Sequence, residues 1–233
     1  MIDLLLAGTG GALIGTLATG AYAPNSRLFG PVIGWGPRER PHVYLTFDDG
    51  PNPPATEPIL ETLEMYGAPA AFFMVGAHAQ RFPLTARRVA EAGRDIGNHT
   101  YEHVKLHWRG PARIRAELDS AHTEIMRTTG RAPWMFRAPH GYRNPFVTAA
   151  ARRLGYTVFG WSFGVWDSAR PPAEEIRRRV RAKLRPGAII LLHDGDGRDP
   201  RGDRRPTVAA LPGIIRDVRD TGLELRPLRD LIA

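Results

Sequence analysis

The sequence predicts an α/β fold, in which about seven parallel strands alternate with helices in a barrel-like arrangement. After about Pro41, short apolar runs alternate with longer helix-like stretches, the pattern of repeated β-α units around a parallel sheet. A glycine follows each helix-like stretch, as is typical of a helix C-terminus. No glycine-rich phosphate loop follows the first strand. That favours a barrel over an open, doubly wound sheet.

Each element is expected from its own pattern. Strands are expected at short apolar runs bounded by turn residues, and helices at longer stretches with a helical spacing of apolar residues. The expected strands are 42–47, 70–75, 94–97, 134–137, 157–161, 188–193 and 223–228. The expected helices are 55–66, 83–92, 112–128, 145–154, 173–184 and 207–220. In such a fold the chemistry is expected where the strands end.

The composition narrows the range of functions. The chain has 233 residues, 42% of them hydrophobic and 24% charged, which excludes a disordered chain, a coiled coil and a multi-span membrane protein. It contains no cysteine, so any metal must be held by His, Asp or Glu. The formal charge of +8 comes mostly from arginine. No aromatic residues interleave with the densest run, 177–181, so we interpret the charge as solvated helix faces and expect no nucleic-acid partner.

Residues 1–40 form an apolar, glycine-rich N-terminal segment and linker, before a single domain at 41–233. Residues 4–26 carry no charge and are long enough to cross a bilayer, which takes roughly 20 apolar residues. They make a poor secretory signal, because Asp3 precedes them without any Lys or Arg. A membrane anchor and a segment lying against the domain are both open. We expect a monomer that is membrane-associated or extracytoplasmic, with a cytoplasmic location as the alternative.

Ionisable side chains follow five of the seven expected strands. The carboxyl ends of parallel strands meet at one face, so these side chains are expected to converge there. They are Asp48 and Asp49 after the first strand, His99 and His103 after the third, Arg137 after the fourth, Asp167 after the fifth and His193 after the sixth.

Three of these residues suit a metal site. His99 and His103 lie four residues apart, so one helical turn or a tight loop can point both imidazoles the same way. Asp49 is a candidate third ligand. Two histidines and one carboxylate leave a position open for water on zinc, and the metal lowers the pKa of that water to about 7. Arg137, if partly buried, needs a carboxylate partner, for which Asp48 is the natural candidate.

Five ordered motifs resemble the polysaccharide deacetylases, carbohydrate esterase family four, which includes the nodulation-type chitooligosaccharide deacetylases. The motifs are 46–50 (TFDDG), 99–103 (HTYEH), 137–141 (RAPHG), Asp167 and 191–193 (LLH). The resemblance covers about residues 42–230. It implies a distorted (β/α) barrel and a metal-dependent hydrolase acting on carbon–nitrogen bonds other than peptide bonds. Such enzymes remove N-acetyl, sometimes O-acetyl, groups from chitin-like glycans, from the peptidoglycan of cell walls or from xylan.

The resemblance also implies roles for individual residues. Asp49, His99 and His103 would bind one divalent metal, Zn²⁺ first, with Co²⁺ or another transition metal as alternatives. Asp48 would be the base that takes the proton from the metal-bound water. The remaining catalytic roles fall to His193 as the acid for the leaving amine, Arg137 as the residue that orients Asp48, and Asp167 as the partner of His193.

At the positions expected to bind substrate, this sequence matches the family pattern less well than at the catalytic positions. The resemblance implies an oxyanion donor in the backbone N–H of His140 and an acetyl-methyl pocket at Leu191. The family usually has Asp at the position of Gly164 and Trp at that of Ser168. The aromatic wall of the sugar groove is therefore expected from other residues, with Trp161, Phe163 and Trp166 as candidates.

Three other functions are also compatible with parts of the sequence. The first is deacylation of a lipid-linked or small N-acylated sugar, which fits the apolar N-terminus. The second is a zinc peptidase, because His99-x-x-Glu102-His103 fits an inverted zincin pattern with Glu102 as base; that pattern needs a long helix. The third is a non-catalytic glycan-binding protein on the same fold.

Overall fold

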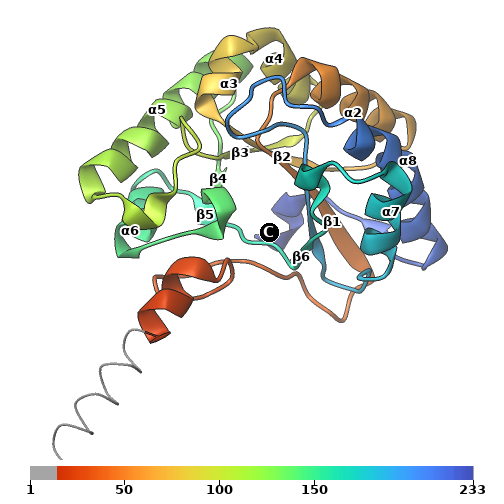
Figure 1. Cartoon of the computed structure of the whole chain (residues 1–233), viewed down its shortest axis with the longest axis horizontal. Coiled ribbons are helices and arrows are strands. Elements are labelled where there is room, and N and C mark those ends of the chain that lie inside the picture. Colours follow the sequence, from red (N-terminus) through yellow and green to blue (C-terminus); the bar gives the residue numbers. More distant parts are fainter. Residues whose placement is uncertain (1–14, 233) are drawn as a thin grey trace, which may run out of the picture.

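Parallel strands form a curled, open half-barrel with helices around its outer face (Figure 1). The computed structural model describes residues 15–232. Within them the sheet order is β5-β4-β3-β2-β1-β7-β6, which confirms the predicted fold class. These strands are β1 (His42–Asp48), β2 (Ala71–Met74), β3 (Asp95–Asn98), β4 (Met135–Phe136), β5 (Thr157–Val158), β6 (Phe163–Gly164) and β7 (Ile189–His193); β8 (Glu224–Leu225) pairs with the start of β1.

Alternation along β1 directs its side chains to two cores. Leu45 and Phe47 pack in the cluster between the sheet and the outer helices, whereas Tyr44 packs in the interior of the half-barrel. Successive side chains of a strand point to opposite faces, so Thr46 and Asp48 share the interior face with Tyr44. Asp48 ends the strand and therefore lies at the mouth of the half-barrel.

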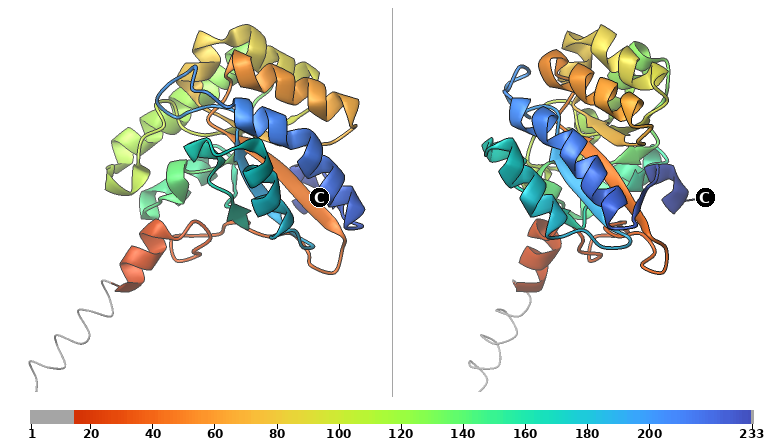
Figure 2. Two further views of the ribbon diagram at one scale, coloured as in Figure 1. Left: turned by 45° about the vertical axis from the view of Figure 1, so that its right-hand side comes forward. Right: turned by 90° about the vertical axis from the view of Figure 1, so that its right-hand side faces the viewer.

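The helices cover the convex side of the sheet (Figure 2). Prolines occupy the first turn of several of them, where the missing N–H costs nothing. α5 ends at Gly130 with φ +70°, a conformation that favours glycine. The helices are α2 (Pro53–Met65), α3 (Gly76–Arg81), α4 (Pro83–Glu91), α5 (Pro111–Thr129), α6 (Pro145–Arg153), α7 (Ala173–Arg181) and α8 (Arg205–Asp220), with short helical turns η1 (Leu106–Trp108), η2 (Pro139–Gly141), η3 (Asp167–Ala169) and η4 (Leu228–Leu231).

Two elements differ from the prediction. The strand expected at 157–161 ends at Val158, and residues 163–164 form a separate strand, β6, that pairs with β7 at the opposite edge of the sheet. The chain between them crosses the open side of the half-barrel, where Gly160 is bonded to residues outside the sheet. α3 was not expected, because its six residues are too few to show a helical period.

The N-terminal segment packs against the domain from Ala21 onward. The carbonyl of Ala21 accepts a hydrogen bond from the N–H of Arg143, and Ile33 and Trp35 form isolated bridges to Phe159 and Ala188. In residues 15–232, no helix has the length and apolarity that a bilayer crossing needs. Residues 1–14, which include the start of the predicted anchor at 4–26, lie outside the described residues. Membrane association and the domain boundary near residue 41 stay predictions.

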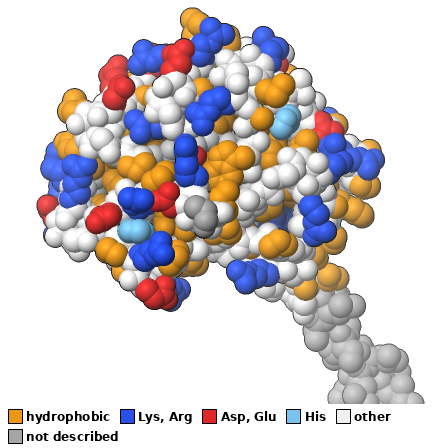
Figure 3. Space-filling model, turned by 180° about the vertical axis from the view of Figure 1, so that it is seen from behind, with side chains coloured by type: hydrophobic (Ala, Val, Ile, Leu, Met, Phe, Trp, Pro, Cys, Tyr) orange, Lys and Arg blue, Asp and Glu red, His pale blue; other side chains and the backbone are white. Residues whose placement is uncertain are grey.

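The basic residues are dispersed on the face that Figure 3 shows. Lys and Arg side chains alternate there with acidic and apolar ones and do not gather into one patch. Several arginines are paired within the protein; Arg178, for example, binds Glu175 one helical turn away at 2.7 Å. This distribution fits the interpretation of the +8 charge as solvated helix faces.

Candidate active site

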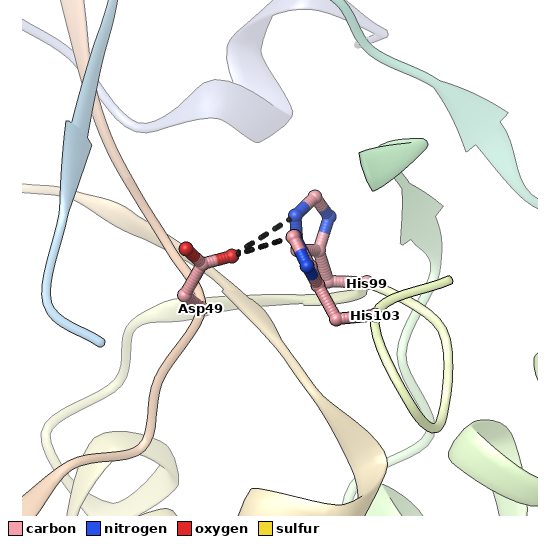
Figure 4. A group of neighbouring side chains, drawn as sticks. All are labelled: Asp49, His99 and His103. Atoms are coloured by element: carbon pink, nitrogen blue, oxygen red, sulfur yellow. Dashed lines mark ion pairs between the residues drawn. The ribbon is translucent and has the colours of Figure 1, made fainter. Parts of the chain in front are cut away.

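Asp49, His99 and His103 converge at the mouth of the half-barrel (Figure 4). Oδ1 of Asp49 lies 3.0 Å from Nε2 of His103 and 3.4 Å from Nε2 of His99. The donor atoms of the three residues all lie within 4.8 Å of one another. Asp49 follows β1, and the two histidines lie on the non-helical loop that follows β3. The three residues predicted as metal ligands therefore lie together in the structure.

Left-handed backbone turns aim these side chains. Asp49 has φ +75° and His103 has φ +53°, and Thr100 between the histidines has φ +68°. Such values are uncommon for residues other than glycine and cluster at functional sites. At Asp49 the turn interrupts the alternation of β1, so that two successive carboxylates both face the mouth.

The donor set fits a divalent transition metal. Nδ1 of His99 lies 2.8 Å from the carbonyl oxygen of Arg137; a carbonyl only accepts, so Nδ1 carries the proton and Nε2 keeps its lone pair. Oδ1 of Asp49 is buried and accepts no hydrogen bond from residues 15–232. Burial alone would raise the pKa of Asp49, but the imidazole of His103 holds that pKa well below its usual range. An ionised carboxylate facing two imidazole nitrogens is a suitable set of ligands for Zn²⁺.

Asp48 is fixed by a buried arginine. Arg137 donates from Nη1 to Oδ1 of Asp48 at 2.7 Å and to Oγ1 of Thr46 at 2.8 Å, and from Nη2 to the carbonyl of Gly160 at 2.8 Å. Its guanidinium also lies over the Phe73 ring, 4.0 Å from the centroid. The other oxygen of Asp48, Oδ2, lies 3.7 Å from Nε2 of His99. The pairing of Arg137 with Asp48 leaves one carboxylate oxygen next to the donor set.

On the other side of the cleft, His193 is paired with Asp167. The imidazole donates from Nδ1 to Oδ1 of Asp167 at 2.9 Å, while Oδ2 accepts the main-chain N–H of His193 at 2.8 Å and the hydroxyl of Thr207 at 3.0 Å. Burial alone would lower the pKa of His193, but the Asp167 carboxylate raises it to about 9. The imidazole therefore holds a proton at neutral pH, with Nε2 as its free nitrogen.

A cleft of about 510 Å³ encloses these groups. Four of the five residues expected to bind substrate line it: His140, Trp161, Trp166 and Leu191. The expectation was wrong for Phe163, whose side chain is buried in the core between the sheet and the outer helices. Trp166 is 75% exposed, so most of its ring is available to a ligand. Gly164 also lines the cleft; it occupies the position where the family usually has aspartate. Arg137 and Asp167 lie behind Asp48 and His193, respectively.

Two supporting residues were missed by the sequence analysis. Glu117 of α5 is buried, and its Oε2 accepts the N–H groups of Tyr101 and Glu102, both at 2.9 Å. It braces the loop that carries both histidines, a role that the family resemblance implies for Thr100, whose buried hydroxyl makes no hydrogen bond within the described structure. His78 is buried and donates from Nδ1 to the carbonyl of Asp49 at 2.8 Å. Neither residue is close in sequence to the residue it supports, so no local pattern could identify them.

The peptidase alternative conflicts with the position of Glu102. Its side chain is 54% exposed and forms an ion pair with Arg113, so it does not face the donor set. The histidine loop is not helical, whereas the inverted zincin pattern needs a helix. The acidic residue beside the donor set is Asp48.

Comparisons with known proteins find the family that the ordered motifs resemble. The family model for polysaccharide deacetylases matches residues 36–159. A chitooligosaccharide deacetylase of Bradyrhizobium sp. (strain ANU 289) is 37% identical over 199 residues, covering 81% of this chain and 90% of that protein. A peptidoglycan-N-acetylglucosamine deacetylase of Bacillus cereus is 33% identical over 198 residues, covering 84% and 90%.

A solved structure extends the match to three dimensions. It is a peptidoglycan N-acetylglucosamine deacetylase in complex with 4-naphthalen-1-yl-N-oxidanyl-benzamide. It superposes with a TM-score of 0.79 at 30% identity, covering 85% of this chain and 91% of that one. The half-barrel, the ordered motifs at its mouth and these relatives lead to one assignment: the chain belongs to the polysaccharide deacetylase family.

Proposed function

We propose that the protein is a metal-dependent hydrolase that removes N-acetyl groups from a glycan and releases acetate. The observation that carries the proposal is the convergence of an Asp-His-His donor set with two separately supported proton carriers, Asp48 and His193, in one cleft. Hydrolysis of an amide needs a nucleophile, a polarised carbonyl and a proton for a poor leaving group.

Asp49, His99 and His103 would hold the metal. Imidazole nitrogens with a single carboxylate suit Zn²⁺ or Co²⁺ better than Mg²⁺, which prefers oxygen ligands. When bound, such a metal supplies a Lewis acid that polarises the acetyl carbonyl and lowers the pKa of a coordinated water to about 7.

The chain's own residues carry the protons. Asp48, held by Arg137, accepts a proton from the attacking water as the water oxygen bonds to the carbonyl carbon. His193 donates a proton to the amine nitrogen as the carbon–nitrogen bond breaks, which leaves acetate and a free amino sugar. Asp167 holds the imidazole through Nδ1, so Nε2 is the nitrogen that delivers the proton. General acid and base groups each contribute on the order of 10²–10⁴-fold.

The substrate class follows from the relatives and from the cleft. The relatives are named for chitooligosaccharides and for peptidoglycan N-acetylglucosamine, and both glycans carry N-acetylated sugars. Trp161 and Trp166 present aromatic surface in the cleft that can pack against the apolar C–H face of a sugar ring. Leu191 supplies an apolar contact for the acetyl methyl.

Acetate release tests the proposal. Chitooligosaccharides, peptidoglycan, acetylxylan and a glycolipid fraction are compared, each with and without a chelator. We expect release from at least one N-acetylated glycan, loss of activity on chelation, and recovery with Zn²⁺ or Co²⁺ but not with Mg²⁺. Full activity with the metal content near zero would refute the metal site.

Two neighbouring carboxylates provide a matched pair of variants. Asp48→Asn should bind Zn²⁺ nearly as the parent does and lose activity by roughly two to four powers of ten. Asp49→Asn should lose Zn²⁺ and activity together. If the two variants bind Zn²⁺ equally well, the assignment of ligand and base is wrong.

A further inference from the structure

The segment before the family match packs against two loops that line the cleft. The match begins at residue 36, and the chain at 21–35 runs below β5 and β6 in Figure 1 before it reaches β1. We propose that this segment, through Asn25, positions the Arg137–Asp48 pair and the cleft wall at Trp161. The kinetic part of this inference rests on the proposed function.

Asn25 occupies a close-fitting site formed by two glycines. Its Nδ2 donates to the carbonyl of Trp161 at 2.8 Å. A Cβ atom on Gly34 would lie 2.1 Å from Oδ1 of Asn25, and one on Gly160 would lie 2.0 Å from it. Any side chain at either glycine would displace the amide. Asn25 is therefore held in one place, directly against the peptide that joins residues 160 and 161.

That peptide connects the segment to the proposed base. The N–H of Gly160 donates to the carbonyl of Ile33 at 2.9 Å, and the carbonyl of Trp161 accepts from Asn25, so the segment holds the two peptides that flank the 160–161 peptide. The carbonyl of Gly160 accepts from Nη2 of Arg137 at 2.8 Å, and Nη1 of the same guanidinium binds Asp48 at 2.7 Å. Arg137 is fully buried, and its Nε has no partner within the described structure. Gly160 is therefore one of three groups, with Thr46 and Asp48, that hold its guanidinium by hydrogen bonds. A shift of Gly160 should move Arg137 and with it Asp48.

A second contact supports the loop that carries His140. Gly141 has φ +74°, and a Cβ atom there would lie 2.5 Å from Cβ of Pro24 and 2.8 Å from Cη2 of Trp161. Arg143 is buried; its Nη2 donates to the carbonyls of Pro24 and Ser26, while Nε and Nη1 have no partner in the described structure. A buried guanidinium bonded only to main-chain carbonyls of the segment depends on the segment for its solvation.

The alternative is that the segment only adds stability, and Thr148 provides a control for that. Its hydroxyl donates to the carbonyl of Phe29, in the same segment but away from the cleft. Thr148→Val therefore loosens the segment without touching the contacts of Asn25. Asn25→Ala removes the hydrogen bond to Trp161, and Asn25→Asp keeps the shape but removes the donor.

The test uses the full chain loaded with Zn²⁺. We expect both Asn25 variants to lower kcat about 10-fold, with the Zn²⁺ dissociation constant unchanged, because none of the ligands touches the segment. Thr148→Val should lower Tm and leave kcat unchanged. In the Arg137→Lys protein, Asn25→Ala should lower kcat by less than about twofold. If Asn25 acts through Arg137, the effects of the two substitutions on kcat are not additive in free energy. Equal effects of Asn25→Ala and Thr148→Val on kcat would overturn the proposal. It would also be overturned if Asn25→Ala lowered kcat as much in the Arg137→Lys protein as in the parent.

A measurement without catalysis separates this inference from the proposed function. Amide hydrogen exchange at 159–162 and 140–142 should speed up at least 10-fold in metal-free Asn25→Ala and stay unchanged in Thr148→Val. Unchanged exchange in Asn25→Ala would overturn the positioning role even if the parent is an active deacetylase. If the parent releases no acetate, the proposed function fails, and the exchange result still decides whether Asn25 holds these loops.

Discussion

Replacing Asp167 with asparagine tests how the proton on His193 is held. The Asp167 carboxylate raises the pKa of His193 to about 9 against the effect of burial. Without that charge, burial acts against only the weaker effects of Asp49 and Asp48, and we take the pKa of His193 to fall to about its ordinary value of 6.5. At pH 8 the protonated fraction then falls from about 0.9 to about 0.03. We therefore expect the alkaline limb of the Asp167→Asn profile to lie about 2.5 pH units below that of the parent, with a loss of activity that is largest at alkaline pH and smallest on the acid side.

The assay is the rate of acetate release from an N-acetylated glycan between pH 5.5 and 9.5. A divalent cation in the neighbouring site lowers the pKa of His193 in both proteins. The decisive quantity is therefore the difference in pH between the alkaline limbs of the two pH–rate profiles, that of the parent and that of Asp167→Asn. Thr207→Val is the control, because it removes a hydrogen bond to Asp167 but no charge. An equal loss at every pH would mean that Asp167 only orients the imidazole, and the reasoning from charge would be refuted.

The same pair makes stability depend on pH. The pKa of His193 is higher in the folded than in the unfolded protein. The contribution of the His193–Asp167 pair to the free energy of unfolding is therefore complete below about pH 6.5 and is lost as the pH rises through about 9. The side chain is 18% exposed, so we expect the contribution to be at most about 3 kcal/mol. Urea unfolding of the metal-free parent and Asp167→Asn at pH 6 and pH 10 measures it. A stability difference between the two proteins that does not shrink at pH 10 contradicts this account.

Three further predictions concern the metal site and the acid. Asp49→Ala should abolish Zn²⁺ binding and activity, while Glu102→Gln keeps at least half the activity; the reverse result would restore the peptidase alternative. His193→Ala should be impaired at least 10-fold more on an N-acetyl sugar than on an activated acetate ester, whose leaving group needs no proton; equal impairment would remove His193 as the acid. His78→Leu should weaken Zn²⁺ binding about 10-fold or more, the range seen when a supporting hydrogen bond is removed. His78→Asn keeps a donor near the Asp49 carbonyl and should recover part of that binding. Competition with a chelating dye measures both variants, and unaltered binding in His78→Leu would refute the support role.

Local patterns in the sequence were enough to predict the strand ends. β1 and β7 are long and apolar, and each ends in ionisable residues, so Asp48 and His193 could be placed at one mouth from periodicity alone. Glycine after the helix ends placed the predicted helix C-termini to within a few residues. The resemblance to a known family supplied the individual roles, which spacing alone does not give.

The supports of the site could not be predicted, because they depend on distant contacts. Glu117 lies on the face of an ordinary amphipathic helix, and only the fold brings its carboxylate to the histidine loop. β6 is two residues long, which is too short for a periodic signal. Asn25 lies in a stretch whose lack of charge suggested a membrane anchor. Its glycine partners, Gly34 and Gly160, are separated from each other by more than half of the chain.

The isolated bridges of Ile33 and Trp35 have a consequence for association between molecules. An open half-barrel has two edges, here β5 and β6, and an uncovered sheet edge can recruit strands from other chains. Ile33 pairs beside β5 at Phe159, and Trp35 pairs with Ala188 just before β7, so the N-terminal segment shields the gap between the two edges. A protein shortened to begin near Arg38, as one might design to remove apolar residues, would leave that gap uncovered. We expect it to self-associate more than the full chain, so the apolar N-terminus would protect solubility rather than reduce it.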